Sequence, residues 1–190
     1  MNSNHARICT SPEWAEHIQN DILPEVTRGV DLGQDMLEIG PGPGAATEWL
    51  RHRVPSLTAI EVDEEAAAAL AKRYAGTNVR VVTGTAAELG YPDESFDSVG
   101  SFTMLHHVPT LALQNKILTE AFRVLRVGGV LVGSDSLASN DRHHLHADDT
   151  YNPVEPAALL TRLQTIGFAR IAMVVNGSVT FAASKAAGAA

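Results

Sequence analysis

The feature that most constrains the fold of this chain is a regular alternation of short apolar segments with longer segments of helical character. Seven segments have the apolar and β-branched content typical of strands: residues 36–39, 57–62, 79–84, 96–102, 130–136, 168–177 and 178–185. Five helical segments lie before or between them: residues 12–28, 45–54, 63–76, 110–129 and 155–167. Strands that alternate with helices need crossover connections, so the pattern predicts a mainly parallel sheet with helices on both faces. Only the turn at Asn176-Gly177 separates the last two strands, so we expect that pair to be antiparallel.

The predicted fold class is therefore α/β. We expect a single doubly wound, Rossmann-like domain with a seven-stranded, mostly parallel sheet that contains an antiparallel strand. A length of 190 residues suits one domain. We divide it into an N-terminal helical cover (1–30), a ligand-binding core (33–136), a polar lid loop (137–153) and a C-terminal helix with a strand pair (154–185).

Composition and charge exclude several classes of protein. The formal net charge is −8 and the 14 Lys and Arg residues are scattered, which argues against a protein that follows a nucleic-acid backbone. Cys9 is the only cysteine, so no intrachain disulfide can form. The first residues lack the charged-then-apolar pattern of a signal peptide, and no apolar run reaches the roughly 18 residues of a membrane span. We expect a cytoplasmic protein.

A glycine-rich loop follows the first predicted strand, in the segment 35–47, DMLEIGPGPGAAT. Its glycines satisfy both the dinucleotide pattern G-x-G-x-x-[GA] and the tighter G-x-G-x-G. Glycine lets a ligand approach the main chain, and the next helix begins with unpaired N–H groups. No Lys-Ser/Thr pair follows, which excludes a P-loop. The loop alone leaves a dinucleotide and S-adenosylmethionine open as ligands.

Two carboxylates narrow this choice. Glu38 lies two residues before Gly40, where a carboxylate would oppose a pyrophosphate but suits a ligand with a cationic amino-acid end. Glu61 closes the second predicted strand, where an acidic residue accepts hydrogen bonds from ribose hydroxyls. Both candidate ligands carry a ribose, so Glu61 predicts a nucleoside and Glu38 favours one with an ammonium-bearing tail.

Four segments in order carry a family resemblance: LEIGPGPGAAT at 37–47, AIEVDEE at 59–65, the stretch 81–108 that ends in LHHV, and AFRVLRVGGVLV at 121–132. Together they resemble the class I S-adenosylmethionine-dependent methyltransferases, most closely the small-molecule, type 11-like branch. The resemblance covers about residues 33–136, with a weaker match at LLTRLQTIGFARIAM.

The resemblance implies a cofactor site. Glu38 and the backbone of Gly40, Gly42 and Gly44 would surround the methionine end, while Glu61 would accept the ribose hydroxyls and Val62 would lie against the adenine. Thr85 and Ala86 stand where the family often has an aspartate that receives the adenine amino group, so a hydroxyl or backbone contact is expected there. Ser101 and Phe102 would border the methionine moiety and the entrance to the substrate pocket.

The candidate catalytic residues are His106, His107 and Asp135, which follow the fourth strand or end the fifth. Methyl transfer needs a general base only if the nucleophile must lose a proton, so the sequence does not require one. Packing and pocket lining are the alternative roles for the two histidines.

A second group of candidate ligands lies in the predicted lid loop: His143, His144, His146, Asp148 and Asp149. These types bind metals. The segment lacks a helical zinc-binding spacing and a distant partner cluster, so we expect a solvated lid and no metal.

The sequence thus predicts an enzyme that transfers a methyl group from S-adenosyl-L-methionine to a small molecule, with S-adenosyl-L-homocysteine as the product. The expected partners are a small-molecule substrate, without nucleic acid or membrane, in a monomer or homodimer. The alternatives are a protein that binds this cofactor without transfer activity and an NAD-dependent oxidoreductase. Nucleic-acid methylation is disfavoured by the acidic charge and by SFTML after the fourth strand, where such enzymes carry an Asn/Asp-Pro-Pro-aromatic signature.

Overall fold

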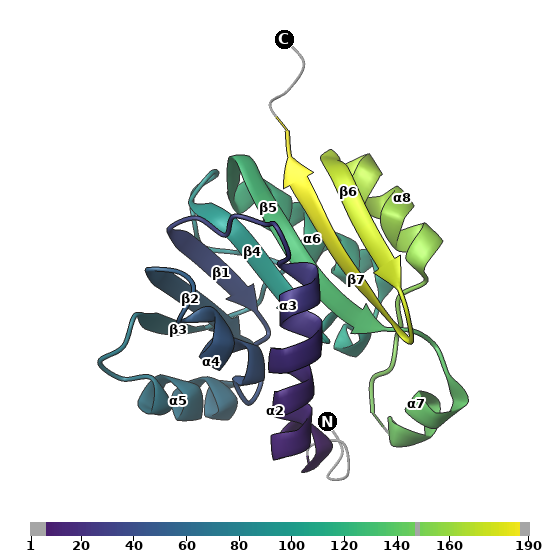
Figure 1. Ribbon diagram of the computed structural model, residues 1–190, viewed down its shortest axis with the longest axis horizontal. Coiled ribbons are helices and arrows are strands. Elements are labelled where there is room, and N and C mark those ends of the chain that lie inside the picture. Colours follow the sequence, from purple (N-terminus) through teal and green to yellow (C-terminus); the bar gives the residue numbers. More distant parts are fainter. Residues whose placement is uncertain (1–6, 147–148, 187–190) are drawn as a thin grey trace.

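The computed structural model describes residues 7–146 and 149–186, without the side chains of residues 140–142. The described chain forms a seven-stranded sheet with the order β3-β2-β1-β4-β5-β7-β6 (Figure 1). The strands are β1 (Asp35–Ile39), β2 (Ser56–Glu61), β3 (Val79–Thr83), β4 (Phe96–Phe102), β5 (Leu125–Ser136), β6 (Phe168–Val175) and β7 (Ser178–Lys185). The pairings among β1 to β5 are parallel, whereas β7 runs antiparallel to both β5 and β6. The predicted fold class is confirmed.

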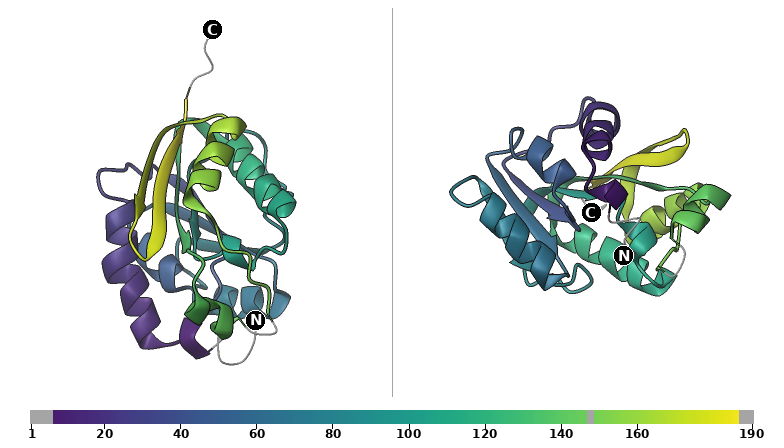
Figure 2. Two further views of the ribbon diagram at one scale, coloured as in Figure 1. Left: turned by 90° about the vertical axis from the view of Figure 1, so that its right-hand side faces the viewer. Right: turned by 90° about the horizontal axis from the view of Figure 1, so that it is seen from below.

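Helices cover both faces of the sheet, and Figure 2 shows the N-terminal helices on one side and α6 and α8 on the other. The longer helices are α5 (Glu64–Arg73), α6 (Leu111–Val124) and α8 (Pro156–Ile166). The short ones are α2 (Pro12–His17), the π-helix η1 (Ile18–Ile22), α3 (Leu23–Val26), α4 (Ala45–Leu50), the 3-10 helix η2 (Leu105–His107) and α7 (Asn140–Leu145). No helix in the described ranges combines the length and apolar character needed to cross a bilayer.

The alternation of side chains along β1 divides the core into two layers. Met36 packs with Leu57 of β2 and with buried residues of η1 and α4. Leu37 and Ile39 point to the opposite face, where they join a cluster that includes buried residues of α6 and α8. Both faces of β1 are therefore buried, as expected for a central parallel strand.

The N-terminal helical segment, predicted over residues 12–28, is interrupted just before Pro24. The break is the π-helix η1 immediately before α3, in which Pro24 is one of the first residues. A proline has no N–H to donate and its ring crowds the carbonyl four residues earlier, and a wider π turn accommodates both effects.

Several element ends differ from the prediction by a few residues, and the largest difference lies between α6 and β5. The helix expected to run to residue 129 ends at Val124, and β5 already begins at Leu125. Arg126 explains this, because its guanidinium group lies 2.6 Å from Asp97 and 3.2 Å from Asp35, which draws the segment onto the sheet. The predicted lid loop also contains a helix, α7.

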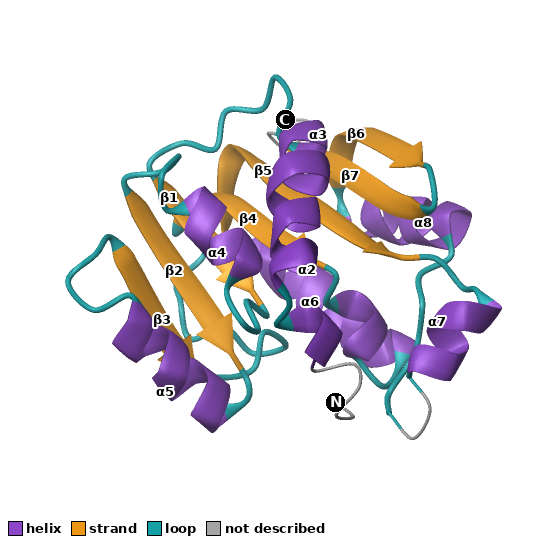
Figure 3. Ribbon diagram, turned by 60° about the horizontal axis from the view of Figure 1, so that its bottom comes forward, coloured by secondary structure: helices purple, strands orange, loops and turns teal. Residues whose placement is uncertain are grey.

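The carboxyl ends of the parallel strands converge at one edge of the sheet, where α7 and the start of α2 also lie (Figure 3). Ligands bind at this edge in open α/β sheets, at the point where the strand order reverses. Here the reversal falls between β1 and β4. The fold thus places the glycine loop after β1 at the expected binding edge.

Candidate functional site

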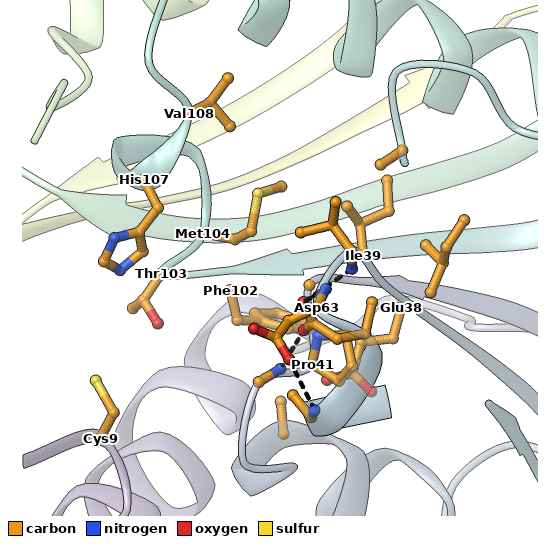
Figure 4. Close-up of a pocket in the computed structure, with 18 of the residues that line it drawn as sticks. Cys9, Glu38, Ile39, Pro41, Asp63, Phe102, Thr103, Met104, His107 and Val108 are labelled. Atoms are coloured by element: carbon orange, nitrogen blue, oxygen red, sulfur yellow. Dashed lines mark hydrogen bonds between the residues drawn. The ribbon is translucent and has the colours of Figure 1, made fainter. Parts of the chain in front are cut away.

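A cavity of about 570 Å³ opens at this edge, beyond the ends of β1, β2 and β4 (Figure 4). Its volume lies within the usual range for small-molecule and cofactor sites. Eight of the ten residues predicted to bind the cofactor line it: Glu38, Gly40, Gly42, Glu61, Val62, Thr85, Ala86 and Phe102.

The other two, Gly44 and Ser101, are outside the lining. A side chain at Gly44 would collide with Leu70, so this glycine permits the contact between α4 and α5. Ser101 is buried within β4, between Ile39 of β1 and Gly133 of β5 in the sheet.

The glycine loop needs its glycines for different reasons. Gly40, Gly42 and Gly44 have φ values of 65°, 51° and 86°, in the left-handed region that other residues avoid. A Cβ at Gly40 would strike Met104, whereas a Cβ at Gly42 would meet no protein atom within 4 Å. Gly42 lines the cavity and has open space beside its Cα.

Glu38 is a buried carboxylate with an exposed fraction of 1%. Its Oε2 accepts a 2.7 Å hydrogen bond from the Thr47 hydroxyl, and none of the described Lys and Arg side chains forms an ion pair with it. Burial raises the pKa of Glu38 from 4.5 to about 7, partly offset by the Thr47 hydrogen bond, and the charge of Glu61 adds a small increase. The site thus holds a carboxylate that a cation would stabilise in its charged form.

Glu61 closes β2 and is fixed by the main chain. Its Oε2 accepts from the Gly42 N–H at 3.0 Å, and its Oε1 accepts from the N–H groups of Val62 and Asp63 at 2.9 and 3.1 Å. These bonds tie the glycine loop to the end of β2. The residue after it, Val62, is 72% exposed although it lines the cavity, so it offers an apolar surface to a flat ring.

Thr85 also lines the cavity, where its hydroxyl accepts from the Ala87 N–H at 3.2 Å. This bond stabilises the turn after β3. The threonine that stands at the family's aspartate position therefore has a local structural contact.

A second cavity of about 200 Å³ adjoins the first. Cys9, Trp14, Thr103 and His107 line both cavities. Figure 4 places Cys9, Thr103 and His107 on the opposite side of the larger cavity from Glu38 and Asp63. The residues that line only the smaller cavity are Ile8, His106, Ser136, Leu145 and His146.

Two of the three catalytic candidates reach these cavities. His106 Nδ1 lies 2.7 Å from Asp135 Oδ1, and both side chains are buried. The Asp135 carboxylate also accepts 2.7 Å hydrogen bonds from the N–H groups of Leu105 and Ser136. Asp135 lines neither cavity, and its contact with them runs through the ring of His106.

Sequence reasoning missed several lining residues. Thr103 has a φ of 52°, which is rare for a threonine, and its N–H donates to the Ser134 carbonyl at 2.8 Å. No sequence signal predicts this left-handed backbone conformation at Thr103. Trp14 and Ile18 lie on the N-terminal helical segment. The sequence pattern predicts this segment to be a cover, and that prediction is the signal that could have identified both residues.

The predicted lid segment also contributes to the site. Asp149 and Thr150 line the larger cavity, and His146 lies beside His106 and His107. The expectation that the histidines of this segment have no distant partners was wrong for His146. Strands β4 and β5 are parallel neighbours, so the segment that follows β5 begins beside the residues that follow β4. Asp148 lies outside the described residues.

Several known proteins are similar to this chain in sequence. A family model described as a methyltransferase domain matches residues 37–133. A "probable S-adenosylmethionine-dependent methyltransferase" of Mycolicibacterium smegmatis is 35% identical over 102 residues, which cover 54% of this chain and 38% of that protein. A "probable ribosomal RNA small subunit methyltransferase A" of Pyrobaculum islandicum is 38% identical over 85 residues, or 44% of this chain and 36% of that one.

Among solved structures, a Haemonchus contortus N-methyltransferase in complex with phosphomonomethylethanolamine and S-adenosylhomocysteine has the same fold. It superposes with a TM-score of 0.72 at 15% identity, over 92% of this chain and 56% of that chain. The match to the curated relatives spans well under half of their length. The family model alone matches about half of this chain, and on that ground the chain belongs to the methyltransferase-domain family.

Proposed function

We propose that this protein is a methyltransferase that binds S-adenosyl-L-methionine in the larger cavity and methylates a small molecule held in the smaller one. The observation that carries this proposal is Glu38, a carboxylate buried at the glycine loop without a described Lys or Arg ion-pair partner. An ammonium group would supply a positive charge that stabilises the Glu38 carboxylate, whereas a pyrophosphate would place further negative charge beside Glu38 and Glu61.

The residues present fit this cofactor on two counts. The space beside Gly42 lets a ligand approach the main chain closely, and Glu38 lies behind the same loop. Glu61 stands at the end of β2 with its carboxylate fixed by three N–H groups, in position to accept from a ribose diol. The cofactor would supply an activated methyl group on a sulfonium, and the protein would supply alignment and exclusion of water.

The acceptor side is the smaller cavity. Thr103 and His107 line both cavities, so they mark where the two compartments meet. His106 and His107 provide polar groups toward an acceptor, and Asp135 fixes the ring of His106.

A small acceptor is supported over a nucleic acid by the lining of the two cavities. Of the described residues, no lysine or arginine lines either cavity. Proteins that hold nucleic acid place such cations along the phosphate backbone. A volume of about 200 Å³ also limits the part of an acceptor that enters.

Calorimetry tests the cofactor assignment. S-adenosylhomocysteine should bind one site per chain, and NAD should bind at least tenfold more weakly. The Glu38→Gln variant should bind S-adenosylhomocysteine more weakly than the wild type, and its affinity for NAD should be unchanged. Preferential binding of NAD would overturn the proposal and favour the oxidoreductase.

Transfer activity needs a separate assay. Fractionated metabolite extracts with added S-adenosylmethionine should produce S-adenosylhomocysteine, detected by mass spectrometry, in one or a few fractions. At a limiting cofactor concentration, the Gly42→Ala variant should produce less S-adenosylhomocysteine than the wild type. If the cofactor binds tightly but no extract supports turnover, the chain is a cofactor-binding protein instead.

A further inference from the structure

The smaller cavity contains a cluster of three histidines from two distant segments. His106 and His107 belong to η2, and His146 follows α7. One nitrogen from each ring lies within 4.8 Å of those of the other two. The ring centroids are 4.0 Å apart for His106 and His107, and 5.2 and 5.4 Å from these two to His146. The folding of the chain, not sequence proximity, brings the third ring to the first two.

The ring of His106 is oriented from behind. Its Nδ1 lies 2.7 Å from the buried Asp135 carboxylate, which makes Nε2 the atom that faces a ligand. Asp135 is itself fixed by the N–H groups of Leu105 and Ser136. A carboxylate that orients a histidine from its second nitrogen is the usual support of a metal-binding imidazole.

The other two rings also line the smaller cavity. His146 stacks on Tyr151 with ring centroids 4.3 Å apart and planes inclined by 23°. His107 is half-buried and lines both cavities. A closer approach of the three nitrogens requires the rings of these two residues to rotate.

We propose that His106, His107 and His146 bind a divalent cation of the zinc type, with an open coordination position toward the smaller cavity. Three imidazole nitrogens suit zinc and its transition-metal neighbours, whereas magnesium and calcium prefer oxygen ligands. Zn–N bonds of about 2.1 Å in a tetrahedron place the nitrogens roughly 3.4 Å apart. The widest pair, at up to 4.8 Å, must therefore close by about 1.4 Å.

An open position defines the class of acceptor. A zinc-type ion with three protein ligands lowers the pKa of a bound hydroxyl or thiol and stabilises its anion. This step rests on the proposed function: the acceptor would then offer an oxygen or sulfur atom that binds the ion and needs no histidine base. The metal site itself does not depend on methyl transfer.

Metal binding tests the proposal directly. The chain, freed of metal with a chelator, is titrated with Zn²⁺ by calorimetry and with Co²⁺ by visible absorption. We expect one ion per chain and an intense tetrahedral Co²⁺ spectrum. His107→Ala and His146→Ala should each weaken Zn²⁺ binding at least a hundredfold. Asp135→Asn should weaken it about 10- to 100-fold through the orientation of His106.

His144→Ala is the matched control, because His144 is an exposed histidine of the same segment. It should bind Zn²⁺ as the wild type does. Circular dichroism of each variant checks that it is folded. The proposal is overturned if the wild-type chain binds no Zn²⁺, or if folded His107→Ala and His146→Ala variants bind it unchanged.

Azide tests the open position, since it coordinates a metal ion without resembling a cofactor or acceptor. Azide should change the spectrum of the Co²⁺ form. An unchanged spectrum would show a closed, structural site and overturn the inference about the acceptor. Failure of S-adenosylhomocysteine to bind, with the Co²⁺ results intact, would instead overturn the proposed function alone.

Discussion

The Thr47 hydroxyl donates a 2.7 Å hydrogen bond to the Glu38 carboxylate, and both side chains are buried. The bond links α4 to β1 directly behind the glycine loop. It only partly offsets the cost of burial, because the pKa of Glu38 is still raised from 4.5 to about 7.

Glu38→Gln should change how stability depends on pH. The pKa of Glu38 is higher in the folded than in the unfolded chain. The stability that the protonated Glu38 side chain contributes is therefore fully present below about pH 4.5 and is lost as the pH rises to about 7. The free energy of unfolding of the wild type falls by about 3 kcal/mol over this range, whereas a glutamine at this position does not titrate and causes no such fall. The free energy of unfolding of the variant, relative to wild type, should rise by about this amount between pH 4.5 and 7 and stay constant above. Urea unfolding across this range measures it.

Exposed Glu88→Gln provides the comparison for that measurement. It should parallel the wild type at every pH. A difference between Glu38→Gln and wild type that does not vary with pH would contradict the raised pKa.

Binding of S-adenosylhomocysteine should release a proton from Glu38. An ammonium group stabilises the ionised carboxylate, which is the minor form at pH 6 and the major form at pH 8 when the pKa is about 7. The affinity should therefore rise about tenfold between pH 6 and 8. Calorimetry in two buffers of different ionisation enthalpy counts the protons. An affinity independent of pH in the wild type would count against the contact, and Glu38→Gln should show that independence.

Gly42→Ala should separate ligand binding from folding. The φ of 51° strains any alanine, and its Cβ would occupy open space at a residue that lines the cavity. We expect a stability loss of about 1–2 kcal/mol and at least a tenfold loss of affinity for S-adenosylhomocysteine. Gly76→Ala carries a similar strain, with a φ of 77° and no atom within 4 Å, but lies outside the cavity. It should lose stability without losing affinity, and equal losses of affinity would disprove the assignment.

Glu61→Ala should weaken recognition of the ribose. The carboxylate fixes three N–H groups, so its removal should also lower the melting temperature. Affinity for adenosine, which has the ribose but no ammonium, should fall roughly 5- to 100-fold. Glu38→Gln should leave adenosine binding unchanged. If the two variants exchanged these effects, the orientation of the ligand would be reversed.

The central fold was predictable because strand and helix periods alternate clearly along the chain. The turn at Asn176-Gly177 likewise predicted the antiparallel pair. The positions of Glu38 and Glu61 relative to strand ends marked them as candidate binding residues, and both line the larger cavity. These signals are local, so one sequence contains them.

The features that were missed depend on distant contacts. The boundary between α6 and β5 depends on Arg126, which reaches Asp35 and Asp97 far along the chain. The meeting of His146 with His106 depends on how the segment after β5 folds back. Thr103, which has a positive φ, follows β4 and donates its N–H to Ser134 of β5, and no local sequence pattern specifies this conformation.

The two cavities differ in where their walls come from along the chain. Of the five residues that line only the smaller cavity, Ile8, Ser136, Leu145 and His146 lie outside the segment that matches the methyltransferase family, and His106 lies within it. Glu38, Gly42 and Glu61 all lie inside that segment. Substitutions in the flanking segments can therefore reshape the smaller cavity, the proposed acceptor compartment, while the carboxylates and glycines of the larger cavity stay intact. Under the proposed function, such substitutions would change the acceptor without a new fold or a new cofactor site.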